Sequence, residues 1–139
     1  MLAEFRFHHI GIAVFSIDET AEMYLAAGYE KTETIFDPIQ NVHICFLTKD
    51  GMPMMELLAP HDETSPVYQT LQKNGVTPYH CCYEVDDMED AIRQLRKMRY
   101  VATSKPVPAV AIDHRRVCFL YHKKMGLIEL VERKGLSFE

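Results

Sequence analysis

The chain of 139 residues lacks any long apolar run and any pattern of basic residues typical of nucleic-acid binding. No apolar stretch approaches the roughly 20 residues that a bilayer-spanning helix needs, and residues 1–7 lack the apolar core of a signal peptide. A formal net charge of −5 with mostly scattered Lys and Arg is not typical of a nucleic-acid-binding protein. These absences predict a cytoplasmic protein with no membrane span and no nucleic-acid partner.

Paired-cysteine motifs are also missing, because the four cysteines at positions 45, 81, 82 and 118 show no CxxC spacing. This pattern favours reduced thiols in the core over a structural zinc site. Apolar residues make up 47% of the chain and charged residues 25%, as in an ordinary globular protein. A chain of this length can bury a core without disulfides. We therefore expect one folded domain over residues 1–139.

The two halves of the sequence resemble each other in three segments that occur in the same order. The matched segments are 9–14 with 80–85, 43–47 with 116–120, and 55–58 with 128–131. Spacing is kept as well, since His43 precedes Glu56 by 13 residues and Arg116 precedes Glu129 by 13 residues. An ordered repeat of this kind indicates a duplicated structural module.

Three helices are predicted from capping residues and apolar periodicity. The first covers about residues 17–27, with Ser16 as its cap, and the second covers about residues 88–98, capped by one of two adjacent aspartates. A Ser-Pro pair begins a short linking helix at about residues 65–75, and a glycine ends it.

The remaining apolar segments alternate in the manner of strands, among them about residues 31–36 and 99–104. Each half is then a βαβββ module, the first over about residues 5–60 and the second over about residues 77–133. We predict an α+β fold in which the two modules form one curved, eight-stranded, mostly antiparallel sheet with the helices on its convex face.

Four potential metal ligands are expected on the concave face of this sheet. Side chains two residues apart on a strand share a face. The apolar residues around His9 are expected to face the covering helix, so His9 points the other way, and the repeat gives His80 the same orientation. Glu56 and Glu129 are turned into the concavity by the same alternation. Two imidazoles and two carboxylates suit Zn²⁺, Co²⁺, Ni²⁺, Mn²⁺ or Fe²⁺, and a cation would offset the repulsion between the carboxylates.

Further residues are expected to line the same concavity, where they would contact a substrate. On the strand over residues 43–47, Ile44 and Phe46 are taken to pack under the helices, which leaves the alternate residues on the concave face. The repeat extends this assignment to the second module. The wall residues predicted in this way are His43, Cys45, Cys82, Arg116 and Cys118.

At these positions the sequence resembles the vicinal-oxygen-chelate superfamily, which includes glyoxalase I, methylmalonyl-CoA epimerase, extradiol dioxygenases and bleomycin-resistance proteins. The resemblance covers nearly the whole chain. The segments most similar to the epimerase branch are 8–14, 56–60, 65–66, 79–87 and 127–131. It assigns His9, Glu56, His80 and Glu129 to the four metal-ligand places. Residues 106–113 depart from the pattern, because the epimerase group usually has a glycine-rich segment there.

The resemblance implies a metal-dependent epimerase or isomerase that moves a proton at a carbon next to a carbonyl. A 2-methyl-branched acyl-CoA such as methylmalonyl-CoA is the expected substrate. Glu56, Glu129 and His43 are the candidate bases. The alternatives are a glyoxalase I-like lactoylglutathione lyase with the same ligand set and a non-enzymatic small-molecule-binding protein of the resistance type. A small-molecule substrate and a second copy of the chain, in a homodimer, are the expected partners.

Overall fold

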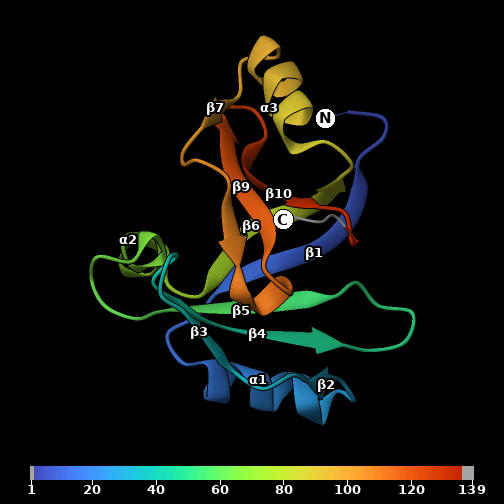
Figure 1. The fold of residues 1–139 in the computed structure, drawn as a ribbon. Coiled ribbons are helices and arrows are strands. Elements are labelled where there is room, and N and C mark those ends of the chain that lie inside the picture. The colour runs from blue at the N-terminus through green and yellow to red at the C-terminus, as the bar shows by residue number, and fades with distance from the viewer. Residues whose placement is uncertain (1, 136–139) are drawn as a thin grey trace. The chain divides into compact units, whose positions relative to one another are not determined.

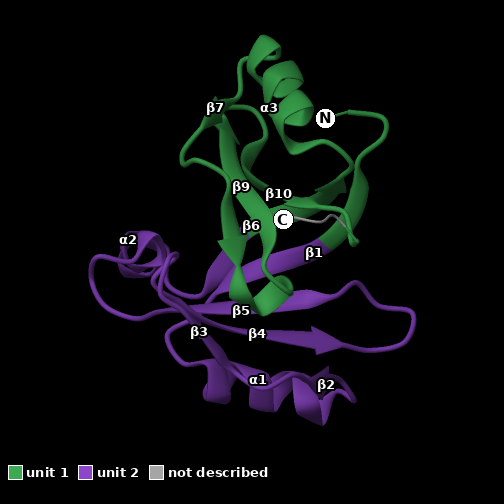
Figure 2. Cartoon of the chain, viewed as in Figure 1, with its two compact units in different colours: residues 1–8, 80–139 green, residues 9–79 purple. Residues whose placement is uncertain are grey.

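The computed structural model describes residues 2–135, and the chain divides into two compact units (Figure 2). The N-terminal unit comprises His9–Tyr79, and the C-terminal unit comprises Met1–His8 together with His80–Glu139. Over residues 2–135 the chain forms ten strands and three α-helices, which confirms the predicted α+β class (Figure 1).

The N-terminal unit contains one mixed sheet and two helices. Its elements in chain order are β1 (Arg6–Ala13, which begins in the C-terminal unit), α1 (Ile17–Ala26), β2 (Glu30–Lys31), β3 (Ile35–Asp37), β4 (Val42–Thr48), β5 (Met55–Pro60) and α2 (Pro66–Asn74). The strands lie in the order β2-β4-β5-β1, and β3 also pairs with β4. Strand β1 is parallel to β5, whereas the other pairs in this unit are antiparallel.

The C-terminal unit repeats this arrangement. Its elements are β6 (Thr77–Val85, which begins in the N-terminal unit), α3 (Met88–Lys97), β7 (Val101–Ala102), β8 (Val107–Ala109), the 3₁₀ turn η1 (Val110–Ile112), β9 (Arg115–His122) and β10 (Gly126–Glu132). The strand order is β6-β10-β9-β7, and β8 pairs with β9. Strands β6 and β10 are parallel, as β1 and β5 are in the other unit. Each unit therefore has the order βαββββ, one strand more than the predicted βαβββ module.

The helices begin at the residues that the sequence predicts. The Ser16 side chain accepts a hydrogen bond from the backbone N–H of Glu19, and Asp87 caps α3 by accepting from the N–H of Asp90. Ser65 caps α2, which ends before Gly75 with its positive φ of 72°. Side-chain caps of this kind satisfy N–H groups that have no partner within the helix. None of the helices formed by residues 2–135 is long and apolar enough to cross a membrane.

Each unit buries one face of its sheet against an amphipathic helix, which is α1 in the N-terminal unit and α3 in the C-terminal unit. In the N-terminal unit, the buried residues of this core are Val14, Ile17, Ala21, Cys45, Leu47, Leu57 and Ala59. In the C-terminal unit they are Val85, Met88, Ala91, Ile92, Leu95, Tyr100, Cys118, Leu120, Ile128 and Leu130. Because side chains alternate along a strand, the residues between these positions lie on the opposite face of each sheet.

The structure has ten strands where the sequence predicted eight. The strand expected at about residues 31–36 is divided into β2 and β3, because the Thr32 hydroxyl accepts a hydrogen bond from the Phe46 N–H and interrupts the regular ladder. In the C-terminal unit, the strand expected at about residues 99–104 is only the two-residue β7. A separate β8 follows it and contains Pro108, which cannot donate a backbone hydrogen bond and suits a strand at a sheet edge.

Candidate metal centre

The N-terminal unit holds His9 and Glu56 side by side on the face opposite α1. Gly11 is the register partner of Glu56 in the parallel pair β1–β5, and His9 shares a face with Gly11 because it lies two residues earlier. The His9 Nε2 atom is 3.2 Å from Glu56 Oε1. Their side chains are 0% and 3% exposed, so this pair has little access to water.

The C-terminal unit holds His80 and Glu129 in the equivalent arrangement. Cys82 is the register partner of Glu129 in the parallel pair β6–β10, and His80 lies two residues before Cys82 on the same face. The His80 Nε2 atom is 3.1 Å from Glu129 Oε1, and the two side chains are 0% and 3% exposed. The duplication read from the sequence is therefore reproduced by two buried His–Glu pairs.

A phenylalanine packs against the histidine of each pair. Phe46 is the register partner of Glu56, and its ring meets the imidazole of His9 edge to face, with centroids 5.4 Å apart and an interplanar angle of 76°. Phe119 is the register partner of Glu129 and meets His80 in the same way, at 5.1 Å and 86°. Such contacts restrict the orientation of a ring and surround it with apolar surface.

The chemistry of these side chains fits a divalent metal. A buried carboxylate is costly unless a positive charge or several hydrogen bonds compensate it, and each unit buries one beside an imidazole. Each pair offers an imidazole nitrogen and a carboxylate oxygen, both of which are possible metal ligands. A mixed nitrogen and oxygen set suits the first-row transition metals and zinc, as the sequence predicts.

His43 and Cys45 do not lie where the sequence analysis placed them. Strand β4 aligns His43 with Ala59 and Cys45 with Leu57, and both partners face α1. Phe46, which was expected to face the helices, lies on the Glu56 side instead. The prediction that His43 and Cys45 share a face with the metal ligands is therefore wrong. Burial raises the pKa of the Cys45 thiol, which fits an unreactive core residue.

His43 has its own surroundings on the helix side of the N-terminal unit. Its Nε2 atom lies 3.0 Å from Nδ1 of His61, and the rings of both histidines contact Phe36. It also lines a cavity of about 230 Å³ that Ser16 and Asp18 border at the start of α1. His43 is thus a polar residue on the α1 side of the sheet in this unit.

Arg116 and Cys118 are also on the helix side, contrary to prediction. Arg116 forms ion pairs with Glu89 of α3, at 2.7 Å, and with the buried Glu132. Cys118 belongs to the core beneath α3, and burial raises its pKa to about 11. Of the three cysteines assigned to the concave wall, only Cys82 lies on the face of Glu129.

The reversal has a physical cause. Both faces of β4 are buried, since Ile44 is 3% exposed and Cys45 is 1% exposed, so apolar alternation does not show which face meets the helix. Phe46 and Phe119 were missed for the same reason. The repeat could have identified both phenylalanines, because they occupy equivalent positions in the two halves. Phe46 lies ten residues before Glu56, and Phe119 lies ten residues before Glu129.

A family model for the glyoxalase/bleomycin resistance protein/dioxygenase superfamily matches residues 8–119 of this chain. The chain is 33% identical over 129 residues to the mitochondrial methylmalonyl-CoA epimerase of Homo sapiens, a match that spans 90% of this chain and 72% of the human protein.

Solved structures agree with these sequence relatives. The methylmalonyl-CoA epimerase of Mycobacterium tuberculosis superposes with a TM-score of 0.81 at 28% identity, over 95% of this chain and 92% of that one. A variant of the Streptomyces coelicolor methylmalonyl-CoA epimerase in complex with 2-nitronate-propionyl-CoA superposes with a TM-score of 0.79 at 30% identity, over 94% and 98% of the two chains. With the repeated modules and the paired His and Glu residues, these matches show that the chain belongs to the glyoxalase/bleomycin resistance protein/dioxygenase superfamily and, within it, to the methylmalonyl-CoA epimerase family.

Proposed function

We propose that this chain is a metal-dependent epimerase that transfers a proton at the carbon between the carboxylate and the thioester of methylmalonyl-CoA. The observation that carries the proposal is the buried His–Glu pair found once in each unit, at 3.2 Å and 3.1 Å. The identity of the substrate is inferred from relatives and structural neighbours that are methylmalonyl-CoA epimerases.

The proposal assigns His9, Glu56, His80 and Glu129 to one shared divalent metal. When bound, the metal acts as a Lewis acid that stabilises negative charge on the carbonyl oxygen as the neighbouring carbon loses its proton. Sharing one metal requires the two units to form a single domain. We therefore keep the predicted arrangement, a continuous curved sheet with the helices on its convex face, as part of the proposal.

Glu56 and Glu129 are the proposed proton carriers. Epimerisation removes a proton from one face of the carbon and returns one to the opposite face, so no atom or electron is gained or lost overall. Two carboxylates related by the internal repeat provide one such group for each face. The imidazoles of His9 and His80, held by Phe46 and Phe119, act as fixed neutral ligands.

Deuterium exchange tests this function directly. The metal-loaded protein is incubated in heavy water with a single epimer of methylmalonyl-CoA, and both epimers should form with solvent deuterium at the carbon next to the thioester. Glu129→Gln should lower that exchange rate by at least about 10²-fold, the contribution of a positioned acid or base. Elemental analysis of the variant separates loss of the base from loss of the metal.

The same assay distinguishes the two alternatives. Turnover of the glutathione hemithioacetal, without exchange on the CoA thioester, would replace the epimerase with a glyoxalase I-like lyase. Substrate binding without any exchange by the metal-loaded protein would indicate a non-enzymatic binder. The homodimer and the cytoplasmic location stay predictions, and light scattering and cell fractionation would test them.

A further inference from the structure

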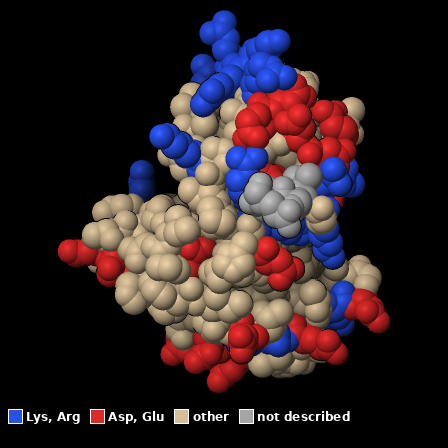
Figure 3. All heavy atoms as spheres, in the orientation of Figure 1, with Lys and Arg blue, Asp and Glu red and all other residues tan. Residues whose placement is uncertain are grey.

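Positive charge is concentrated in one segment of this acidic chain. Residues 91–112 contain three arginines and two lysines and no acidic residue, although the whole chain carries a net charge of −5. The cations of this segment are Arg93, Arg96, Lys97, Arg99 and Lys105. In the space-filling view, Lys and Arg side chains gather over α3 and the turn that follows it (Figure 3).

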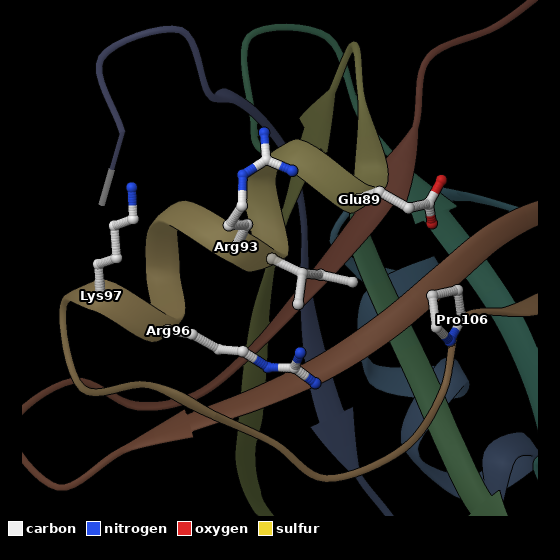
Figure 4. Close-up of a pocket in the computed structure, with 6 residues that line it drawn as sticks. Glu89, Arg93, Arg96, Lys97 and Pro106 are labelled. Atoms are coloured by element: carbon white, nitrogen blue, oxygen red, sulfur yellow. The ribbon is translucent and has the colours of Figure 1, made fainter.

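A groove of about 680 Å³ lies beside these cations in the C-terminal unit. Its lining consists of Glu89, Ile92, Arg93, Arg96, Lys97 and Pro106. Figure 4 shows the Arg96 side chain extending from α3 toward Pro106, across the space between the helix and the segment that joins β7 to β8. Ile92 and Pro106 add apolar surface, so the groove combines positive charge with a non-polar wall.

Two of the three lining cations are available to a ligand. Arg93 forms an ion pair with Asp90, and Glu89 is occupied by Arg116. Arg96 and Lys97 form no ion pair with any residue in 2–135. Positive side chains in the last turn of a helix interact favourably with the helix dipole, and this accounts for their place in α3. It does not account for the groove with an apolar wall beside them.

The chemistry of the groove fits a phosphorylated nucleotide. A guanidinium and an ammonium bind phosphate oxygens through charge-assisted hydrogen bonds, and an arginine plane also stacks on a planar base. A volume of about 680 Å³ is far larger than one phosphate group needs and lies within the range of small-molecule sites. The apolar surface of Ile92 and Pro106 suits the base or ribose of such a ligand.

We infer that Arg96 and Lys97 form a binding site for a phosphorylated adenine nucleotide. Two sources have this chemistry: the nucleotide end of a CoA thioester and a free nucleotide. The first source rests on the proposed function. The groove lies on the helix side of the C-terminal unit and Glu129 on the opposite face of its sheet, so a CoA substrate would have to pass the edge of the sheet, where β7 is the last strand.

The site is tested by calorimetric titration with adenosine 3′,5′-bisphosphate, which requires no turnover. The double variant Arg96→Gln with Lys97→Gln should weaken binding by at least about tenfold, as expected when charge-assisted contacts are removed. Lys123→Gln with Lys124→Gln removes the same charge from the turn between β9 and β10 and should bind like the unaltered protein. Absence of binding by the unaltered protein, or equal weakening in both double variants, would overturn the inference.

Kinetics then identify the source. If the substrate tail occupies the groove, the Arg96/Lys97 variant should raise KM for methylmalonyl-CoA by about the same factor and leave KM for methylmalonyl-pantetheine unchanged. An unchanged KM for both thioesters, with weakened bisphosphate binding, supports the inference with a free nucleotide as ligand. Failure to turn over either thioester would refute the proposed function and leave the calorimetric result standing.

Discussion

His43 lies on a different face of its strand from the candidate metal ligands. It pairs with Ala59 on the α1 side of β4, whereas Phe46 and Glu56 lie on the opposite face. We therefore expect His43→Ala to keep its metal and to exchange substrate protons within about tenfold of the unaltered rate. A general base would contribute about 10² to 10⁴ to that rate. The rate of deuterium incorporation is the measurement, and a loss in that range would return His43 to the mechanism.

Phe119 is expected to support metal binding without touching the metal. Its ring fixes the imidazole of His80 from the side, and residues that orient metal ligands typically affect metal affinity by about 10- to 100-fold. Phe119→Leu should therefore weaken metal binding by about tenfold in a chelator competition titration. Phe7→Leu, at a half-exposed position in the same unit, serves as the matched control. Equal affinities in the two variants would show that Phe119 has no orienting role.

At the residue scale, His9, Glu56, His80 and Glu129 could be identified as candidate ligands because polar residues in apolar strands occur twice at matched positions. Their binding of a metal stays a prediction. His43 and Arg116 were misplaced, because β4 and β9 bury both faces and their alternation is ambiguous. The register with β5 and β10 resolves the ambiguity, and register is a property of the folded sheet rather than of one strand.

At the scale of elements, an ion-pair cluster joins the start of β1 to the end of β6. Glu84 accepts hydrogen bonds from Arg6 Nε, at 2.9 Å, and from Arg115 Nη2, at 2.5 Å. Burial alone would raise the pKa of Glu84, but the hydrogen bonds from Arg6 and Arg115 outweigh it and hold the pKa below its usual value. The Arg115 side chain is only 7% exposed, so it depends on Glu84 for compensation of its charge.

Glu84→Gln should therefore destabilise the protein by about 3 kcal/mol at pH 7, since it leaves a buried guanidinium without its carboxylate. Because the folded pKa of Glu84 is lowered, its stabilising contribution is complete above the unfolded pKa and is lost as the pH falls through the folded value. The stability difference between the two proteins should thus shrink below about pH 4.3, the usual pKa of glutamate. Urea unfolding at a series of pH values measures it, and a difference that does not depend on pH would contradict this assignment.

Helix ends were more predictable than edge strands. Ser16 and Ser65 act through their own side chains within three residues of sequence, so a local pattern is sufficient to place them. The division between β2 and β3 depends on a hydrogen bond between Thr32 and Phe46, which are far apart in sequence. The short β7 and β8 likewise exist only through pairing with β9, so local propensity could not set their bounds.

For the whole molecule, the proposed metal would take one histidine and one glutamate from each of the two units. Neither pair alone provides enough ligands for a structural or catalytic site, which usually takes three or four protein donors. A metal shared in this way would stabilise both units together, and the folded protein would gain stability with the logarithm of the metal affinity.

The purified protein should contain about one divalent metal per chain, and its removal by a chelator should lower the free energy of unfolding. The loss is about 2.7 kcal/mol if free metal had been present at 100 times its Kd, and it should exceed this value for tighter binding. His80→Ala should contain almost no metal and unfold at the same temperature with or without chelator, because the remaining ligands no longer hold the ion. His61→Ala, a histidine outside both pairs, should respond to the chelator like the unaltered protein. Full metal content in the His80→Ala protein, measured by elemental analysis, would separate metal binding from these pairs and refute the proposed centre.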